Sequence, residues 1–280
     1  MFDTLAQMLS YGFMIRALVV GALVSLCSAL LGVSLVLKRL SMLGDGLSHI
    51  SFGVFAVAAA FNAAPLALAA PVVILAAFLI LRGGKSGKTS PDAVVALISA
   101  GALAVGVMII SFTGKGNIDM MNYLFGSILA IGRGDLLIGI ILAALALTVF
   151  VLFYNKIFAV VFDENFARAT GVGVERYNAL TAILTSVTVV VGMRMMGALL
   201  LSGLITFPVL TAMRICKTFK SVTICSGCVA VASFVLGLVT SAFCAAPTGA
   251  CVVVVNIAAF LAFSAIVAVK KFLSALPVNK

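Results

Sequence analysis

The sequence predicts an all-α polytopic membrane protein: a bundle of eight or nine transmembrane helices forming a single domain over residues 1–280. Three observations predict this fold class. Hydrophobic residues make up 64% of the chain and charged residues only 9%, whereas soluble domains carry about 25% charged residues. The mean hydropathy is +1.32. The apolar residues form long continuous runs, which are typical of spanning helices and not of the short alternating segments of a membrane β-barrel.

Nine apolar segments approach the length of about 20 residues that a helix needs to cross a bilayer. They lie at roughly residues 11–37, 43–61, 65–81, 92–112, 135–154, 177–193, 196–213, 222–243 and 249–269. The seventh segment is short and contains Pro208. Eight full spans are therefore an alternative, and the sixth and seventh segments are either two spans or one broken pair.

The basic residues predict how the bundle is oriented. If the turn at Lys38 and Arg39 is cytoplasmic, 14 of the 18 lysines and arginines fall on the cytoplasmic side, as the positive-inside rule expects. The N-terminus then lies outside and the C-terminus in the cytoplasm. The formal charge of +10 follows from this topology and from attraction to anionic lipid headgroups, so it does not indicate a nucleic-acid partner. The basic residues that fall elsewhere are Arg16, Lys115, Arg133 and Arg194.

Two further motifs have simpler explanations. The stretch RGGKSGKTS at residues 82–90 resembles a phosphate-binding loop, but Arg82 occupies the position of its first glycine, so a basic cytoplasmic turn explains it better. CSGC at residues 225–228 has the spacing of a metal or redox motif. Because a tight zinc site needs four ligands and no histidine is near, we interpret Cys225 and Cys228 as small packing residues.

Asp45 and His49 form the pair most suggestive of chemistry. His49 is the only histidine in the chain, and spacing of four residues places it on the same helix face as Asp45. It lies about 10 Å deeper than the preceding turn, where ionisable groups are costly and usually face a cavity or a partner. Each residue also has a structural explanation of its own. Asp45 could stabilise the N-terminal turn of its helix, and His49 could form a hydrogen bond between helices. Together, two copies across a two-fold axis supply two nitrogens and two oxygens, a set that suits zinc.

Two other classes of function compete with metal binding. An intramembrane metalloprotease requires a motif such as H-E-x-x-H, and this chain has one histidine. An intramembrane aspartyl protease needs a second buried aspartate, whereas Asp119 and Asp135 fall in loops or at segment ends. An ion-coupled secondary transporter is the other class, but the hydropathy shows no clear inverted repeat.

The longest cytoplasmic connection, residues 161–180, predicts a short amphipathic helix. Asp163 and Glu164 precede it, and Gly171 and Gly173 follow it, which is the usual punctuation of a helix. Such a helix is either an element of the membrane interface or a docking surface for another protein.

Ordered motifs along nearly the whole chain resemble those of the membrane permeases of ATP-binding-cassette importers for zinc and manganese. The motifs are KRLSMLGDGLSHISFG at residues 38–53, DMMNYLFGSIL at 119–129, FDENFARATGV at 162–172, GALLLSGLITFPVLTA at 197–212 and PTGACVVV at 247–254. The first contains the signature G-D-x-x-S-H, which here includes Asp45 and His49.

The resemblance implies a role for each motif. Asp45 and His49 correspond to the proposed metal pair of the translocation pathway. Residues 162–173 correspond to the coupling helix that fits a groove on the cytoplasmic ATPase. Within it, the residues expected to serve ATPase coupling are Asp163, Glu164, Phe166, Ala167, Arg168 and Gly171.

The resemblance also implies the assembly. We expect a homodimer in the cell membrane, two separate ATPase subunits, and an extracytoplasmic metal-binding lipoprotein that delivers the ion. The chain itself would have no enzymatic activity and no permanently bound cofactor, and ATP would act only through the partner. Manganese-type members commonly carry proline and glycine a few residues after the S-H pair. This chain has Phe52 at the proline position, and its YLFGSIL stretch is closer to zinc-type members, so zinc is expected, with manganese or ferrous iron as the alternative.

Overall fold

The computed structural model describes residues 12–85, 90–113, 124–126 and 132–275, and throughout these residues the regular structure is helical. The all-α membrane fold is therefore confirmed. Parts of two sequence motifs, residues 86–89 of the phosphate-loop-like turn and 119–123 and 127–129 of the second family motif, lie outside the described residues, as does Asp119.

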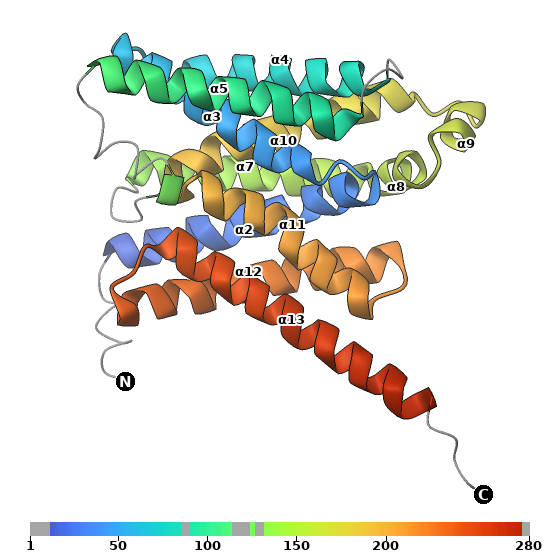
Figure 1. Cartoon of the computed structure of the whole chain (residues 1–280). Helices are drawn as coiled ribbons and strands as arrows, with labels where there is room; N and C mark the ends of the chain where they lie inside the picture. Colours follow the sequence, from blue (N-terminus) through green and yellow to red (C-terminus); the bar gives the residue numbers. More distant parts are fainter. Residues whose placement is uncertain (1–11, 86–89, 114–123, 127–131, 276–280) are drawn as a thin grey trace, which may run out of the picture.

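The helices follow the predicted apolar segments closely. They are α2 (Gly12–Leu37), α3 (Met42–Ala60), α4 (Pro65–Lys85), α5 (Pro91–Thr113), α7 (Arg133–Leu152), α8 (Tyr154–Phe162), α9 (Glu164–Ala169), α10 (Val174–Met196), α11 (Ala198–Ile215), α12 (Phe219–Cys244) and α13 (Thr248–Ala275). Eight of the described helices are long and apolar enough to cross a membrane, and the bent pair α7–α8 makes up to nine. Figure 1 shows α8 and α9 together at one end of the bundle, here named the α9 end.

The broken segment is the fifth one and not the seventh. At Phe153 the chain bends by 71° between α7 and α8. In contrast, α11 continues through Pro208 as a helix of 18 residues, and only Gly197 separates it from α10. The sixth and seventh segments are thus two complete helices. Neighbouring helices tolerate an internal proline in a membrane bundle because they satisfy the backbone groups that it frees.

The helices α2, α3 and α10 form the interior of the bundle. In their most apolar windows, 72% of the residues of α2 and 67% of those of α3 and α10 are buried, against 11% for α13. Figure 1 shows α4 and α5 along one flank, α12 and α13 along the other, and α13 diverging from the body toward the C-terminus. The guanidinium of Arg214 on α11 lies 5.4 Å from the ring centroid of Phe260 on α13, which is a cation–π contact between the two helices.

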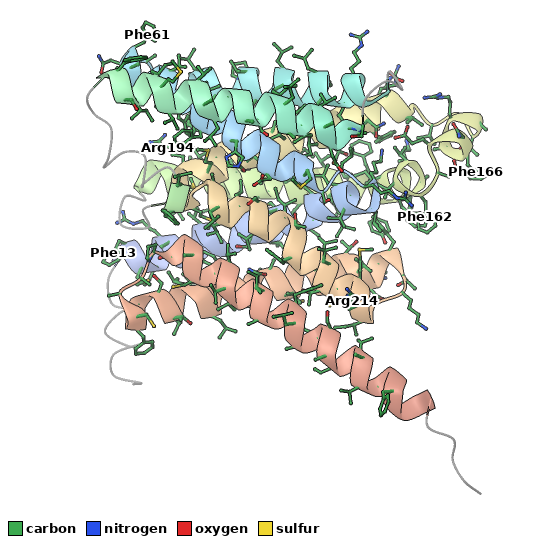
Figure 2. All side chains as sticks on the ribbon, in the orientation of Figure 1. Phe13, Phe61, Phe162, Phe166, Arg194 and Arg214 are labelled. Atoms are coloured by element: carbon green, nitrogen blue, oxygen red, sulfur yellow. The ribbon has the colours of Figure 1, made fainter. Side chains whose placement is uncertain are left out.

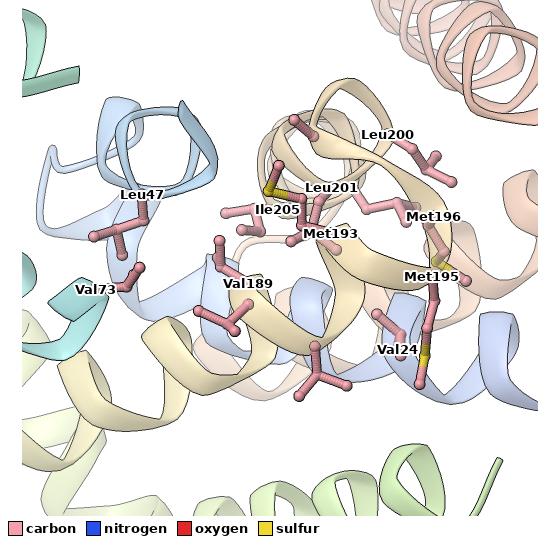
Figure 3. Close-up of a cluster of buried hydrophobic side chains, with 14 of the residues drawn as sticks. Val24, Leu47, Val73, Val189, Met193, Met195, Met196, Leu200, Leu201 and Ile205 are labelled. Atoms are coloured by element: carbon pink, nitrogen blue, oxygen red, sulfur yellow. The ribbon is translucent and has the colours of Figure 1, made fainter. Parts of the chain in front are cut away.

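The main apolar core lies where α10 and α11 pack against α2, α3 and α4 (Figure 3). Leu47, Val73, Val189, Met193 and Leu201 are all completely buried there. Lipid tails are as apolar as these side chains, so burial alone does not drive helices together in a bilayer. Close packing and dispersion do so instead.

At the end opposite α9, three glycines allow backbones to touch. Gly197, between α10 and α11, has φ +86° and ψ 159°, a conformation that is essentially restricted to glycine. A Cβ added there would lie 2.4 Å from the backbone nitrogen of Gly126. A Cβ on Gly249 would lie 2.8 Å from the carbonyl oxygen of Phe125. Segment 124–126 is therefore packed directly on the α10–α11 junction and the start of α13.

We predict that Gly197→Ala destabilises the bundle by about 1–3 kcal/mol, because alanine is strained at this φ and its Cβ would overlap the neighbouring backbone. The measurement is thermal unfolding of the detergent-solubilised protein. Gly101→Ala is the matched control, since no atom lies within 4 Å of a Cβ at that helical position. Equal melting temperatures for the two variants would contradict the prediction.

Candidate metal pathway and coupling helix

The pair Asp45 and His49 lies in the first half of α3. The α2–α3 turn passes through Arg39, whose φ is +60°, and the backbone nitrogen of Leu40 donates to the carbonyl of Leu35 at 2.9 Å. Asp45 therefore falls in the first turn of α3. Its Oδ2 lies 3.5 Å from Nε2 of His49, at the outer limit of a hydrogen bond, so the two side chains share one face as predicted.

The surroundings of the pair leave room for a ligand. The side chain of Asp45 is 43% exposed and that of His49 is 29% exposed, and the Asp45 carboxylate faces the hydroxyl of Ser202 on α11. The Nδ1 atom of His49 is buried without a hydrogen-bond partner among the described residues. An unsatisfied buried nitrogen costs about 1–3 kcal/mol.

One chain places two side chains of types that can bind metals at this site. Among the described residues, no group of three or more His, Cys, Asp or Glu side chains could hold a metal ion. Imidazoles and carboxylates are ligands of zinc, iron and manganese in proteins, but two such groups do not complete a coordination shell. Within the part of the chain that the structure describes, the pair by itself is therefore an incomplete metal site.

Gly46 fixes the rotation of α3 next to the pair. It is buried, and a Cβ added to it would lie 2.3 Å from Cγ1 of Val95 on α5. This close approach packs the face of α3 that carries Gly46 against α5, while the Asp45 carboxylate on the adjacent face is turned toward Ser202 of α11. The glycine thus holds the candidate site in orientation.

The coupling helix predicted at about residues 162–173 is present as α9, flanked by a cap and a turn. The side chain of Asp163 accepts hydrogen bonds from the backbone nitrogens of Asn165 at 2.9 Å and Phe166 at 3.0 Å, which makes Asp163 the N-cap. Gly171, with φ +82°, reverses the chain after α9, and the nitrogen of Val172 donates to the carbonyl of Ala167 at 3.0 Å.

The two faces of α9 differ sharply. Ala167 is fully buried against Val160 and Val174, and it attaches the helix to α8 and α10. Phe166 is 65% exposed and Phe162, just before the cap, is 73% exposed. Both lie at the α9 end in Figure 2. Phe162 was missed by the sequence analysis, because a phenylalanine at the end of an apolar segment is indistinguishable from a lipid-facing one.

The two charged residues of α9 point in different directions. Arg168 lies 3.8 Å from Glu175 on α10, with both side chains well exposed, so this ion pair contributes little to stability. Glu164 instead turns inward. Its Oε1 accepts from Nζ of Lys38 at 2.9 Å and from Nδ2 of Asn178 at 3.0 Å, and Lys38 also donates to Oδ1 of Asn178.

The sequence did not predict this network. Lys38 is 126 residues from Glu164 along the chain, Asn178 is 14 residues from it, and no periodic spacing relates the three. A cavity of about 880 Å³ adjoins them, with further lining from α3, α4 and α8.

The other residues singled out from the sequence lie neither beside Asp45 and His49 nor on α9. Arg194 is an exposed residue of α10, toward the end opposite α9 (Figure 2). Cys225 and Cys216 pack against an apolar cluster of α2, α8, α11 and α12, and Cys228 is exposed. These environments agree with the interpretation of the cysteines as packing residues.

A bundle of apolar helices long enough to cross a membrane, with a short exposed helix at one end, is an architecture typical of a membrane transport protein. The family model of the ABC 3 transport family matches residues 10–267. The chain therefore belongs to the ABC 3 transport family, and it is a multi-pass membrane protein.

Three relatives show how far similarity extends across metals. The high-affinity zinc uptake system membrane protein ZnuB of Haemophilus influenzae is 28% identical over 85% of this chain and 91% of its own length. A probable iron transport system membrane protein of the same organism is 30% identical over 93% and 92%. The manganese transport system membrane protein MntC of Halalkalibacterium halodurans is 25% identical over 89% and 85%.

A solved structure has the same fold. The structure of PsaBC from Streptococcus pneumoniae in complex with Fab matches with a TM-score of 0.84 and 25% identity. The match covers 94% of this chain and 95% of the other, so the whole bundle, including its order of helices, is shared.

We predict that Asp163→Ala loosens α9 by about 1 kcal/mol, because two backbone amides lose their capping acceptor. Hydrogen–deuterium exchange of a peptide covering residues 164–170 measures this change and should be several times faster in the variant. Asp163→Asn is the matched control, since asparagine also caps helices well. Unchanged exchange in Asp163→Ala would show that packing of Ala167 alone holds the helix.

Proposed function

We propose that this chain is the permease subunit of an ATP-binding-cassette importer that brings a divalent transition metal, zinc, into the cytoplasm. The observation that carries the proposal is the pair Asp45 and His49 on one face of α3, within hydrogen-bonding range of each other and with a buried, unsatisfied imidazole nitrogen. Membership of the ABC 3 transport family supports the transport class, and relatives named for zinc, iron and manganese support a metal substrate.

In this proposal two copies of the chain form the pathway. A homodimer brings two carboxylates and two imidazoles to its axis, which matches the preference of zinc for four ligands in tetrahedral geometry. The partial exposure of Asp45 and His49 in one chain supports a shared site. The residues would hold the ion only in passage, so the ion is the substrate and not a resident cofactor.

The donor set favours zinc over manganese. Imidazole suits zinc well, whereas manganese prefers oxygen ligands, and half of the proposed ligands are nitrogens. Phe52, which replaces the proline of manganese-type sequences, is completely buried and packs near Gly106 of α5. It follows Asp45 by seven residues and therefore lies on the same face of α3 as the pair.

Energy would come from a separate ATPase subunit that binds at the α9 end, which this proposal places in the cytoplasm. Phe162 and Phe166 supply an exposed aromatic surface there, and aromatic side chains are frequent anchors of interfaces. The chain itself would hydrolyse no ATP. A metal-binding lipoprotein would deliver the ion at the opposite end, and residues 1–280 would act as one transmembrane permease domain.

We predict that His49→Ala lowers zinc uptake by more than about tenfold, since loss of even an outer-shell partner costs a metal site about 10–100-fold. The measurement is radioactive zinc uptake by cells that lack their own zinc importer and express this chain with its ATPase and binding protein. Ser51→Ala, on the same helix but turned away from the pair, is the control. Zinc uptake that survives His49→Ala would refute the assigned pathway. If the same cells take up radioactive manganese and the variant loses that uptake instead, manganese is the substrate.

We predict that Phe166→Ala weakens ATPase binding by about 2 kcal/mol, the usual size of an interface hot spot, because the exposed ring no longer fills its partner. The measurement is the amount of ATPase that co-purifies with the permease from mixed membranes. Phe272→Ala is a matched control: Phe272 is 70% exposed on α13, far from α9. Equal ATPase recovery in both variants would place the docking surface elsewhere.

A further inference from the structure

We infer that Lys38 is a positioning residue: through Glu164 and Asn178 it transmits displacement of the coupling helix α9 to α3 and thus to Asp45 and His49. This inference rests on the proposed function, because it presupposes an ATPase that moves α9. It concerns a residue that neither lies in the docking surface nor touches the metal.

The contacts of Lys38 join three helices at one point. The ammonium group extends from the turn after α2, the carboxylate of Glu164 belongs to α9, and the amide of Asn178 belongs to α10. Nζ of Lys38 lies 2.9 Å from Oε1 of Glu164, and the same oxygen accepts from Asn178 at 3.0 Å. Each of the three side chains contacts the other two, so none can shift alone without breaking a charge-assisted bond.

Burial makes these contacts resistant to loss. The Lys38 side chain is only 14% exposed and that of Glu164 38% exposed. A partly buried charge without its partner is strongly unfavourable, so α9 and the end of α2 are expected to move together. The ion pair between Arg168 and Glu175 is a contrast. Its nitrogen–oxygen distance is 3.8 Å and both side chains are exposed, so breaking it costs little free energy.

The covalent path from Lys38 to the metal pair is short and tightly turned. Arg39, with φ +60°, and Leu40, bonded back to Leu35 at 2.9 Å, form a compact turn. α3 begins at Met42, and Asp45 follows Lys38 by seven residues. Because the connecting turn is short and hydrogen-bonded, a displacement of Lys38 is expected to move the first turn of α3 as well.

The cavity beside the network provides the space for such a displacement. Its volume is about 880 Å³, and Lys38, Glu164 and Asn178 all line it. Packed interiors are otherwise dense and resist movement. The end of α2 and α9 can therefore shift together relative to α4 without first separating the core shown in Figure 3.

The test uses the complete transporter, with its ATPase subunits and binding protein, reconstituted in liposomes. It measures zinc imported per ATP hydrolysed. For Lys38→Met we expect the ATPase to remain bound and active while this ratio falls roughly tenfold, within the usual range of coupling free energies. The double variant Lys38→Glu with Glu164→Lys should recover much of the ratio, because it restores the ion pair. Lys270→Met, which removes an exposed lysine of α13, is the control.

Several results would overturn the inference. A wild-type ratio in Lys38→Met would do so, as would a double variant no better than either single one. If Lys38→Met does not assemble, Lys38→Gln, which removes the charge but keeps a hydrogen-bond donor, is measured instead under the same criterion. A wild-type transporter that imports no metal at all would refute the proposed function, and this inference with it, whereas normal import with an unchanged ratio in the variants refutes only the relay.

Discussion

The structure depends on one constraint: inside a bilayer no water is available to satisfy polar groups, so the protein must satisfy them itself. This constraint explains the continuous helices, and it explains why ionisable residues inside the bundle are rare. It also gives meaning to the exceptions. Asp45 and His49 would be costly as passive residues, and Nδ1 of His49 is buried without a hydrogen-bond partner among the described residues.

The two ends of the bundle are built by different physical means. At the end opposite α9, backbones meet directly at Gly126, Gly197 and Gly249, and van der Waals packing holds them. At the α9 end, charged and amide groups join α2, α9 and α10 beside a cavity. Direct backbone packing is lost when the two segments move apart by a small distance. Hydrogen bonds from long side chains can persist through such a movement, because the side chains change conformation.

Relatives named for zinc, iron and manganese have similar identities to this chain and are matched over most of their length. Overall similarity therefore does not separate relatives named for different metals, and the orientation of the candidate pair in this chain comes from local contacts. Here that orientation follows from Gly46, which lets α3 approach α5 closely, and from the face that Asp45 and His49 share with Ser202 of α11.

The sequence by itself determined the fold class, the position of nearly every span, the pairing of Asp45 with His49 and the place of the coupling helix. Each of these is a local property: a run of apolar residues, a spacing of four residues, or a cap and a glycine around a short helix. Only the tertiary structure decided that the break falls at Phe153 and not near Pro208, that Phe162 belongs to the exposed aromatic surface, and that Glu164 turns inward to Lys38 and Asn178. These features depend on contacts between residues distant in the chain, and no local pattern encodes which distant side chains will meet.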